Sequence, residues 1–105
     1  MSLNEEFSHL EASLNQLIAL LDEDGETFWS NYLRRGLTQV KAHRLSGATF
    51  VLGCYGGQDT FSDLTLGKAW QTQEPLRVKN LNERLTHLRT EVFQSANNIA
   101  SRKLW

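Results

Sequence analysis

Apolar side chains recur at helical spacing in the first quarter of the chain. They stand three or four positions apart, as the buried stripe of an amphipathic helix requires. Ser2 and Glu5 form a capping-box pattern ahead of this stripe, and Gly25 suits the left-handed residue that closes a helix. These signals predict a helix over residues 3–23. Its apolar positions are Phe7, Leu10, Leu14, Leu17, Ile18 and Leu21.

Two later segments show the same periodicity. The first predicts a helix over residues 26–45, and Gly36 inside it costs about 1 kcal/mol against alanine unless a close helix contact requires it. The second predicts a helix over residues 80–102, with Asn80 as N-cap and Glu83 three positions later. The two apolar stripes are Phe28, Trp29, Tyr32, Leu33, Leu37 and Val40, and then Leu81, Leu85, Leu88, Val92, Ala96 and Ile99.

The chain between these helices is less regular. Residues 48–55 are consistent with either a strand or a short buried helix. A small β-hairpin is plausible from Asp63–Leu66 and Trp70–Thr72, turning at Gly67. Repeated strand–helix units are absent, so the predicted fold is mainly α. We expect a compact three- to four-helix bundle with a small β-hairpin or irregular insertion before the last helix.

Length and composition fit one domain. The 105 residues, 40% of them hydrophobic and 22% charged, suffice for a single core and predict one helical domain over 1–105. The apolar runs fall far short of the roughly 20 residues that span a bilayer, so no membrane association is expected. Cys54 is the only cysteine and has no internal disulfide partner. Together with the acidic first turn, these features favour a cytoplasmic protein.

Charge is unevenly distributed along a chain whose net charge is -1. Residues 1–26 carry seven acidic groups and no Lys or Arg, whereas residues 27–105 carry eleven basic and five acidic groups. An acidic first helix can dock beside basic later helices, which is the favoured interpretation. It can also oppose a basic partner and steer association. The candidate interaction face is Glu5, Glu6, Glu11, Asp22, Glu23 and Asp24.

The second predicted helix carries the densest basic group, namely Arg34, Arg35, Lys41 and Arg44. Nucleic-acid recognition modules usually combine such a group with a clear positive charge and a known motif. Here the pI is near 6.3, so an ordinary solvated face is favoured. Nucleic acid is therefore an unlikely partner, and a nucleic-acid-associated factor using residues 26–45 is kept as an alternative.

No pattern points to a metal or a cofactor. His9, His43 and His87 lie on separate predicted helices, without the close spacing of metal ligands. Cys54 sits in an apolar run, where a small buried hydrophobe is more common than a nucleophile activated by His43. The glycines at 53–57 lack the ending of a phosphate-binding loop. We therefore assign no catalytic residue, metal or cofactor, and an enzyme is the less favoured interpretation.

The segment after the third apolar run is the most enzyme-like part of the chain. Asp59 and Asp63 flank Phe61 just after a glycine pair, and paired carboxylates can act in acid–base catalysis. Aspartates in such places more commonly cap turns through backbone amides. The candidate loop site is Tyr55, Gly56, Gly57, Asp59, Phe61 and Asp63.

Three tryptophans remain to be placed. Trp29 fits the core stripe of its helix, and we expect Trp70 to reach the core although it stands in a polar stretch. Trp105 is open to either interpretation. Because tryptophan is enriched at interfaces, a homodimer that buries leftover apolar surface is possible.

Residues 55–66 resemble a motif of a family of small bacterial proteins that has no assigned function. The family pattern is an aromatic residue, two glycines, a short turn and then Phe-Asn-Asp-Leu. The chain departs from it at Ser62, where the family has Asn, and in residues 68–79. The resemblance implies a bacterial source and a helix over residues 48–55, and it carries no catalytic residue. The matching residues are Trp29, Leu33, Gly56, Gly57, Phe61, Asp63, Leu64 and Asn82-Glu83-Arg84-Leu85.

These observations do not specify an activity. The favoured interpretation is a non-enzymatic bacterial module that binds an unknown protein partner, for example an immunity-type antagonist of a toxin. One alternative is a small-ligand-binding protein or enzyme that uses the Gly56–Asp63 loop.

Overall fold

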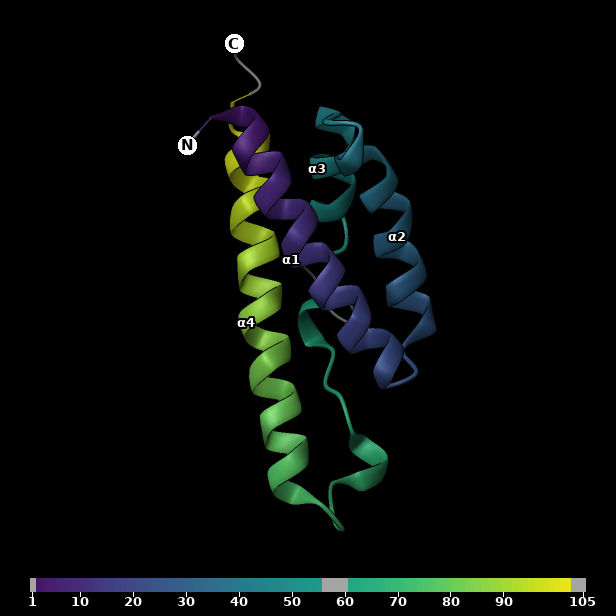
Figure 1. Ribbon diagram of the computed structural model, residues 1–105. Coiled ribbons are helices and arrows are strands. Elements are labelled where there is room, and N and C mark those ends of the chain that lie inside the picture. Colours follow the sequence, from purple (N-terminus) through teal and green to yellow (C-terminus); the bar gives the residue numbers. More distant parts are fainter. Residues whose placement is uncertain (1, 56–60, 103–105) are drawn as a thin grey trace.

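The computed structural model describes residues 2–55 and 61–102, and their fold is mainly helical. The mainly α prediction is confirmed, with more helical elements than the three or four expected and no β-hairpin in the described residues. The α-helices are α1 (Leu3–Glu23), α2 (Thr27–Lys41), α3 (Leu45–Leu52) and α4 (Pro75–Ala100), and the short 3-10 helices are η1 (Phe61–Asp63) and η2 (Lys68–Trp70) (Figure 1).

The helices pack around one core. α1 lies against both α2 and α4, and α3 packs against α2 and α4 (Figure 1). α4 is the longest helix, and its first turns extend past the end of the α1–α2 pair. None of the described helices combines the length and hydrophobicity needed to cross a membrane. Fully buried core side chains include Phe7, Leu14, Leu17, Leu33, Leu85 and Ile99.

The first helix follows its sequence signals closely. The Ser2 hydroxyl accepts the backbone N–H of Glu5 at 3.2 Å, and the Glu5 carboxylate accepts the N–H of Ser2 at 3.1 Å. Hydrogen bonds with Ser2 lower the pKa of the Glu5 carboxyl. Gly25 has φ +77, the left-handed conformation expected of a closing glycine. The predicted bounds 3–23 are confirmed.

The predicted helix over 26–45 ends earlier than expected. α2 stops at Lys41, and His43 adopts a φ of 55 before α3 begins at Leu45. The apolar stripe ends at Val40, but no glycine or proline stands between Val40 and Leu45 to mark the break. Residues 48–52 belong to α3, so the choice between strand and helix is decided in favour of helix.

Glycines allow α2 and α3 to approach each other closely. A Cβ added at Gly36 would lie 2.8 Å from Val51 Cγ2, which confirms the close contact expected there. A Cβ at Gly47 would lie 2.7 Å from the backbone nitrogen of Val40. Backbone cannot move aside as a side chain can, so Gly47 is the less replaceable of the two.

Replacing Gly47 with alanine is expected to lower the free energy of unfolding by about 2 kcal/mol. In an unobstructed helix the same change raises the free energy of unfolding by up to about 1 kcal/mol. The sign of the measured change therefore shows whether the contact with Val40 exists. Urea unfolding checks it, with exposed Lys41→Ala on the neighbouring helix as control. A Gly47→Ala protein at least as stable as the wild type would refute the close packing.

Of the two alternatives predicted for the segment before α4, the β-hairpin over residues 63–72 is wrong. The structure has the irregular insertion, with the short helices η1 and η2. Both backbone groups of Leu66 pair with the side chain of Asn82 and not with a neighbouring strand. Gly67 has φ +72, and the N–H of Trp70 bonds to its carbonyl oxygen at 2.9 Å, which closes a tight turn. The alternation of apolar and polar residues here reflects contact with α4 and not sheet pairing.

The last helix begins five residues before the expected Asn80. Pro75 occupies its first turn, where the missing N–H costs nothing and the fixed φ suits a helix. The sequence pattern from Asn80 resembled a cap, but the described N-cap is Glu74.

Candidate functional site

A strap, defined here as residues 61–74, runs along the first half of α4 and is held there by Arg89. One guanidinium nitrogen of Arg89 donates to the carbonyl oxygens of Phe61 at 2.8 Å and Leu64 at 2.9 Å. The Tyr55 hydroxyl donates to the Arg89 carbonyl oxygen at 2.8 Å. Burial lowers the pKa of Arg89, while Tyr55 and Asp63 partly oppose this shift. The side-chain hydrogen bonds of Arg89 to Phe61 and Leu64 therefore hold the backbone of the strap.

Phe61 is the apolar anchor of this arrangement. It is fully buried, with its ring centroid 5.3 Å from that of Trp29 and 5.7 Å from that of Tyr55. The Arg89 guanidinium lies over the same ring at 5.8 Å. Phe61 is thus a core residue and cannot contact a ligand without local unfolding.

The other members of the candidate loop site have different environments. Gly56, Gly57 and Asp59 lie outside the described residues. Asp63 is exposed at the end of η1. Burial raises the pKa of Tyr55 above its ordinary value of 10.0, so its hydroxyl stays protonated at neutral pH. Tyr55 therefore cannot act as a base near pH 7.

Asn82 holds the strap at a second point. Its amide nitrogen donates to the carbonyl oxygens of Leu66 at 3.0 Å and Val78 at 2.9 Å, and its Oδ1 accepts the N–H of Leu66 at 2.7 Å. At the next residue, the N–H of Gly67 donates to Asp24 Oδ2 at 3.2 Å. The strap is therefore connected both to α4 and to the end of α1.

A groove opens between the strap and the turn that joins α1 to α2. Its volume is about 430 Å³. Trp70 is 49% exposed on one side of it, so the expectation that Trp70 reaches the core is wrong. We call this hollow the Trp70 groove, and its lining residues are Asp24, Glu26, Leu64, Thr65, Gly67, Lys68, Ala69 and Trp70.

A second hollow lies on the other side of Arg89, with a volume of about 350 Å³. The rings of Tyr55 and Phe93 meet edge to face at its wall, with centroids 5.2 Å apart. Its polar groups are hydroxyls and an amide, apart from Arg89. Its lining residues are Tyr55, Ser62, Thr86, Arg89, Thr90, Phe93 and Gln94.

The six acidic residues of the candidate interaction face have separate surroundings. Glu6 is only 7% exposed, and its Oε2 lies 3.3 Å from Arg102 Nε. Asp22 is ion-paired with Arg34, and Asp24 accepts the N–H of Gly67. Glu5 belongs to the capping box, Glu11 is half-buried and Glu23 is exposed. Glu6 and Glu23 line separate hollows against α4, and Asp24 lines the Trp70 groove.

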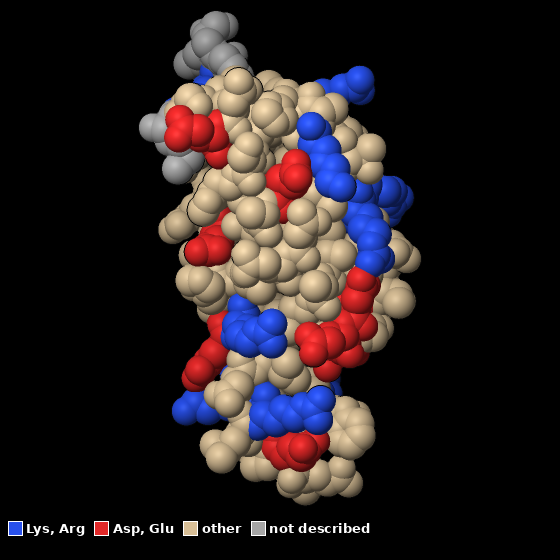
Figure 2. All heavy atoms as spheres, in the orientation of Figure 1, with Lys and Arg blue, Asp and Glu red and all other residues tan. Residues whose placement is uncertain are grey.

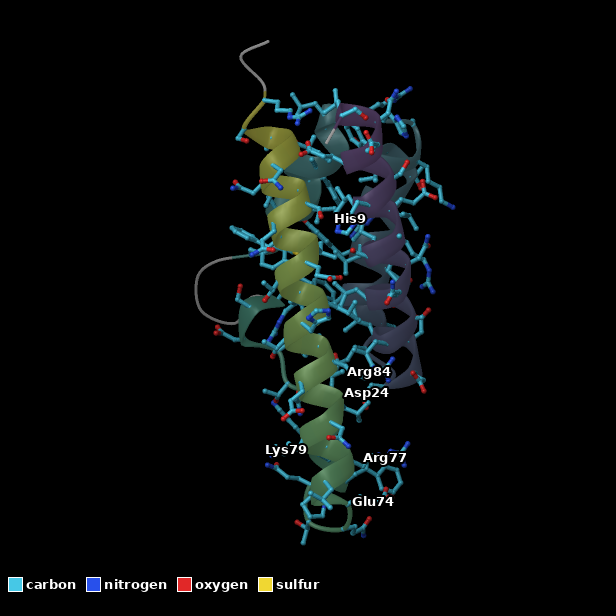
Figure 3. All side chains as sticks on the ribbon, turned by 60° about the vertical axis from the view of Figure 1, so that its left-hand side comes forward. His9, Asp24, Glu74, Arg77, Lys79 and Arg84 are labelled. Carbon is cyan, nitrogen blue, oxygen red and sulfur yellow. The ribbon has the colours of Figure 1, made fainter. Side chains whose placement is uncertain are left out.

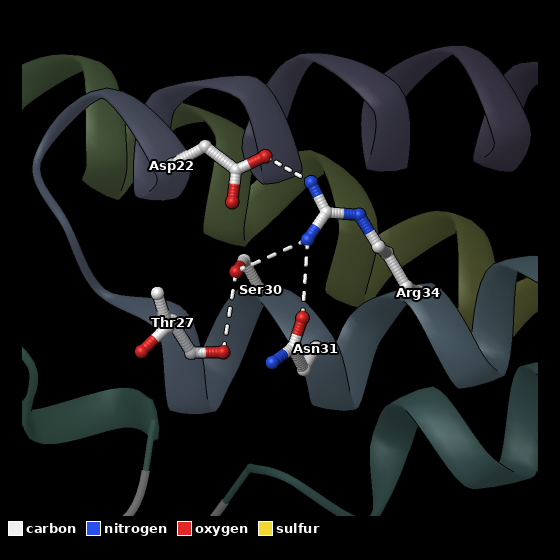
Figure 4. Close-up of polar contacts among 5 residues, drawn as sticks. All are labelled: Asp22, Thr27, Ser30, Asn31 and Arg34. Atoms are coloured by element: carbon white, nitrogen blue, oxygen red, sulfur yellow. Dashed lines mark hydrogen bonds and ion pairs between the residues drawn. The ribbon is translucent and has the colours of Figure 1, made fainter.

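The ion pair of Asp22 belongs to a network on α2 (Figure 4). The guanidinium of Arg34 donates to Asn31 Oδ1 at 3.2 Å and reaches Ser30 Oγ at 3.5 Å. The hydroxyl of Ser30 in turn donates to the carbonyl oxygen of Thr27 at 3.2 Å. This network fixes the first turns of α2 against the end of α1.

The basic residues of α2, together with Arg44 at the start of α3, are only partly available to a ligand. Arg34 is held by Asp22, and the guanidinium of Arg35 lies 5.7 Å from the Tyr32 ring centroid. Lys41 and Arg44 are exposed. Figure 2 shows Lys and Arg side chains along the side of the molecule formed by α2, above acidic side chains near the α1–α2 turn.

The structure places Cys54 and His43 in different contacts. Cys54 is buried, and its thiol donates to the carbonyl oxygen of Val51 at 3.0 Å. His43 Nδ1 lies 3.0 Å from Asn4 Oδ1, and its ring stacks on Phe7. Within residues 2–55 and 61–102, no three metal-ligating side chains lie close enough together to hold an ion.

Native Cys54 is expected to resist thiol reagents. Burial raises its pKa from 9.0 to about 12, so it stays protonated at pH 8 and lacks the reactive thiolate. The rate of labelling by an aromatic disulfide reagent at pH 8 should rise at least a hundredfold when the protein is unfolded in urea. Equal labelling rates in the native and unfolded states would show that native Cys54 is reactive and would support a role as a nucleophile.

The chain matches no family model, no curated protein and no solved structure. The resemblance to small bacterial proteins therefore stays a prediction, and the function has to be argued from the geometry.

Proposed function

We propose that this protein is a non-enzymatic interaction module that binds a basic protein through the Trp70 groove. The observation that carries the proposal is the half-exposed indole of Trp70 in a groove whose other lining residues include Asp24 and Glu26. Exposed tryptophans are common anchors of protein interfaces, and carboxylates beside them select partners of positive charge.

Two of the three carboxylates at the α1–α2 turn are poorly placed for helix stability. Glu23 and Asp24 stand at the C-terminal end of α1, where the partial negative charge of the helix disfavours anions by about 0.3–1 kcal/mol each. Glu26 is the N-cap of α2, yet its side chain makes no capping hydrogen bond. Asp24 already accepts the Gly67 N–H within the fold, and a basic partner would give Glu23 and Glu26 a role as well.

Cations at the same end of the molecule are largely balanced within α4. Arg77 pairs with Glu74 at 3.2 Å, and Lys79 lies 4.0 Å from Glu83. Figure 3 shows Glu74, Arg77 and Lys79 on the first turns of α4, below Asp24. Leu76 is 75% exposed on these turns. Among the residues that line the groove, the two carboxylates of Asp24 and Glu26 outnumber the one cation, Lys68.

An immunity-type protein is the concrete version of this proposal. Such a protein blocks a toxin by covering a functional surface, and a toxin that binds nucleic acid carries a basic surface of the kind this groove suits. A cytoplasmic location and a bacterial source belong to the same proposal.

Replacing Trp70 with alanine is expected to weaken binding of the partner at least tenfold, because truncation removes the central apolar anchor. The wild type and the variant are immobilised in parallel, and a basic protein from the source organism is captured and titrated. Phe93→Ala is the matched control, since it removes an exposed aromatic at the second hollow. The proposal fails if the captured protein is acidic, or if Phe93→Ala weakens binding as much as Trp70→Ala.

Light scattering on the purified protein tests whether a second copy of the chain occupies the groove. A dimer that dissociates in Trp70→Ala but not in Phe93→Ala would mean that another copy of the chain covers the groove. That result would replace the basic partner with self-association.

A further inference from the structure

We infer that the Trp70 groove is a binding site for one arginine side chain, presented by the partner protein. The inference rests on the proposed function and names the group that enters the groove. It predicts a guanidinium stacked on the Trp70 indole and paired with the carboxylates of Asp24 and Glu26.

Negative potential in the groove has separate sources. Asp24 and Glu26 line it, and Asp24 is also the C-cap of α1, where the negative end of the helix dipole lies. One oxygen of Asp24 accepts the N–H of Gly67, which fixes the carboxylate in place before a ligand arrives. A preset carboxylate loses little conformational entropy on binding.

The aromatic wall favours arginine over lysine. A planar guanidinium stacks on an indole face and still donates in its own plane to carboxylates, which an ammonium group cannot do. The volume of about 430 Å³ is within the range of roughly 300–1,000 Å³ for ligand pockets, so one extended side chain fits.

Lys68 also lines the groove and is the natural competitor for its carboxylates. It stands two residues before Trp70 on η2. An incoming arginine has to displace its charge, so a neutral residue at this position should strengthen binding. This expected gain in affinity distinguishes two cases. A ligand inside the groove lies next to Lys68, whereas a ligand attracted only to the acidic turn lies farther from Lys68 and should respond less to its replacement.

The test is a titration of the ¹⁵N-labelled protein with three short peptides that differ at one position. The acetylated, amidated peptide Gly-Arg-Gly is compared with the lysine peptide and with the neutral citrulline peptide, which keeps the shape of arginine. The arginine peptide is expected to shift the Trp70 indole signal saturably and to bind at least threefold more tightly than the lysine peptide. The citrulline peptide is expected to show no measurable binding.

Variants then place the site. Glu26→Gln and Trp70→Ala should each weaken binding of the arginine peptide at least threefold, and Lys68→Met should tighten it at least twofold. Glu11→Gln is the control, because it removes a carboxylate elsewhere on α1. Spectra and urea midpoints near those of the wild type establish that each variant folds. Equal binding of the citrulline peptide, equal binding of the lysine peptide, or no effect of Trp70→Ala would overturn the inference.

Failure of this inference and failure of the proposed function give different results. If no peptide binds, but capture of a basic partner still depends on Trp70, the module stands and the arginine site is rejected. If the arginine peptide binds in the groove but no basic protein is captured, the site stands and the proposed function is rejected.

Discussion

An Arg89→Met variant is expected to unfold with a free energy about 3 kcal/mol below that of the wild type. Arg89 donates charged hydrogen bonds to the carbonyl oxygens of Phe61 and Leu64, and such bonds contribute about 1.5–3 kcal/mol each. Methionine keeps an unbranched apolar stem but removes the Arg89 donor from both carbonyls, and the Phe61 carbonyl then keeps the Leu64 N–H at 3.2 Å. Because Arg89 is half-exposed, the expected loss of unfolding free energy is smaller than the sum of the two hydrogen bonds.

Two companion variants separate the hydrogen bonds from the charge. Arg89→Lys keeps the positive charge but loses the longer, planar guanidinium whose Nη1 reaches both carbonyls, so its stability should lie between those of the wild type and Arg89→Met. Arg84→Met removes an exposed arginine of α4 and should change stability by less than about 0.5 kcal/mol. Urea unfolding followed by circular dichroism measures all three. A loss below about 1 kcal/mol for Arg89→Met would show that the strap does not depend on Arg89.

The long helices were predictable because their signals are local. The capping box of Ser2 and the closing Gly25 specify the ends of α1, and the buried stripe of α4 follows from its spacing. The break at His43 was not predictable, since the residue adopts a positive φ without being glycine. Its ring stacks on Phe7, a residue of another helix, and periodicity within one segment carries no information about that contact.

The candidate site was only partly predictable from the sequence. The segment around Phe61 stood out by its motif, and Asp24 by its place in an acidic run, but nothing in the sequence joined them. Their connection depends on one hydrogen bond from the N–H of Gly67 to Asp24, across 43 positions of the chain. Arg89 carried no local signal at all, because its importance comes from the carbonyl oxygens that it reaches.

Asn82 explains why the sequence of the strap suggested a hairpin. A strand partner would supply a carbonyl oxygen and an N–H to Leu66, and the amide of Asn82 supplies the same two groups. Leu66 therefore has the alternation and backbone pairing of a strand residue, although it pairs with a helix. The motif that resembles the bacterial family includes Asn82, and in this fold it secures the strap.

Replacing Asn82 with alanine is expected to lower the free energy of unfolding by about 2–3 kcal/mol, since three hydrogen bonds of roughly 1 kcal/mol each are lost. The loss should concentrate in the strap, so the Leu66 amide should exchange with deuterium at least tenfold faster than in the wild type.

The control for this prediction is Asn80→Ala, an exposed asparagine on the same helix that should leave both measurements unchanged. Asn82→Asp keeps the acceptor for the Leu66 N–H but removes both donors, so it should protect that amide better than alanine does while remaining less stable than the wild type. Because the strap carries Trp70, Asn82→Ala should also weaken any ligand of the groove without touching it. Unchanged exchange at Leu66 in Asn82→Ala would mean that the strap is held by Arg89 and its apolar contacts alone.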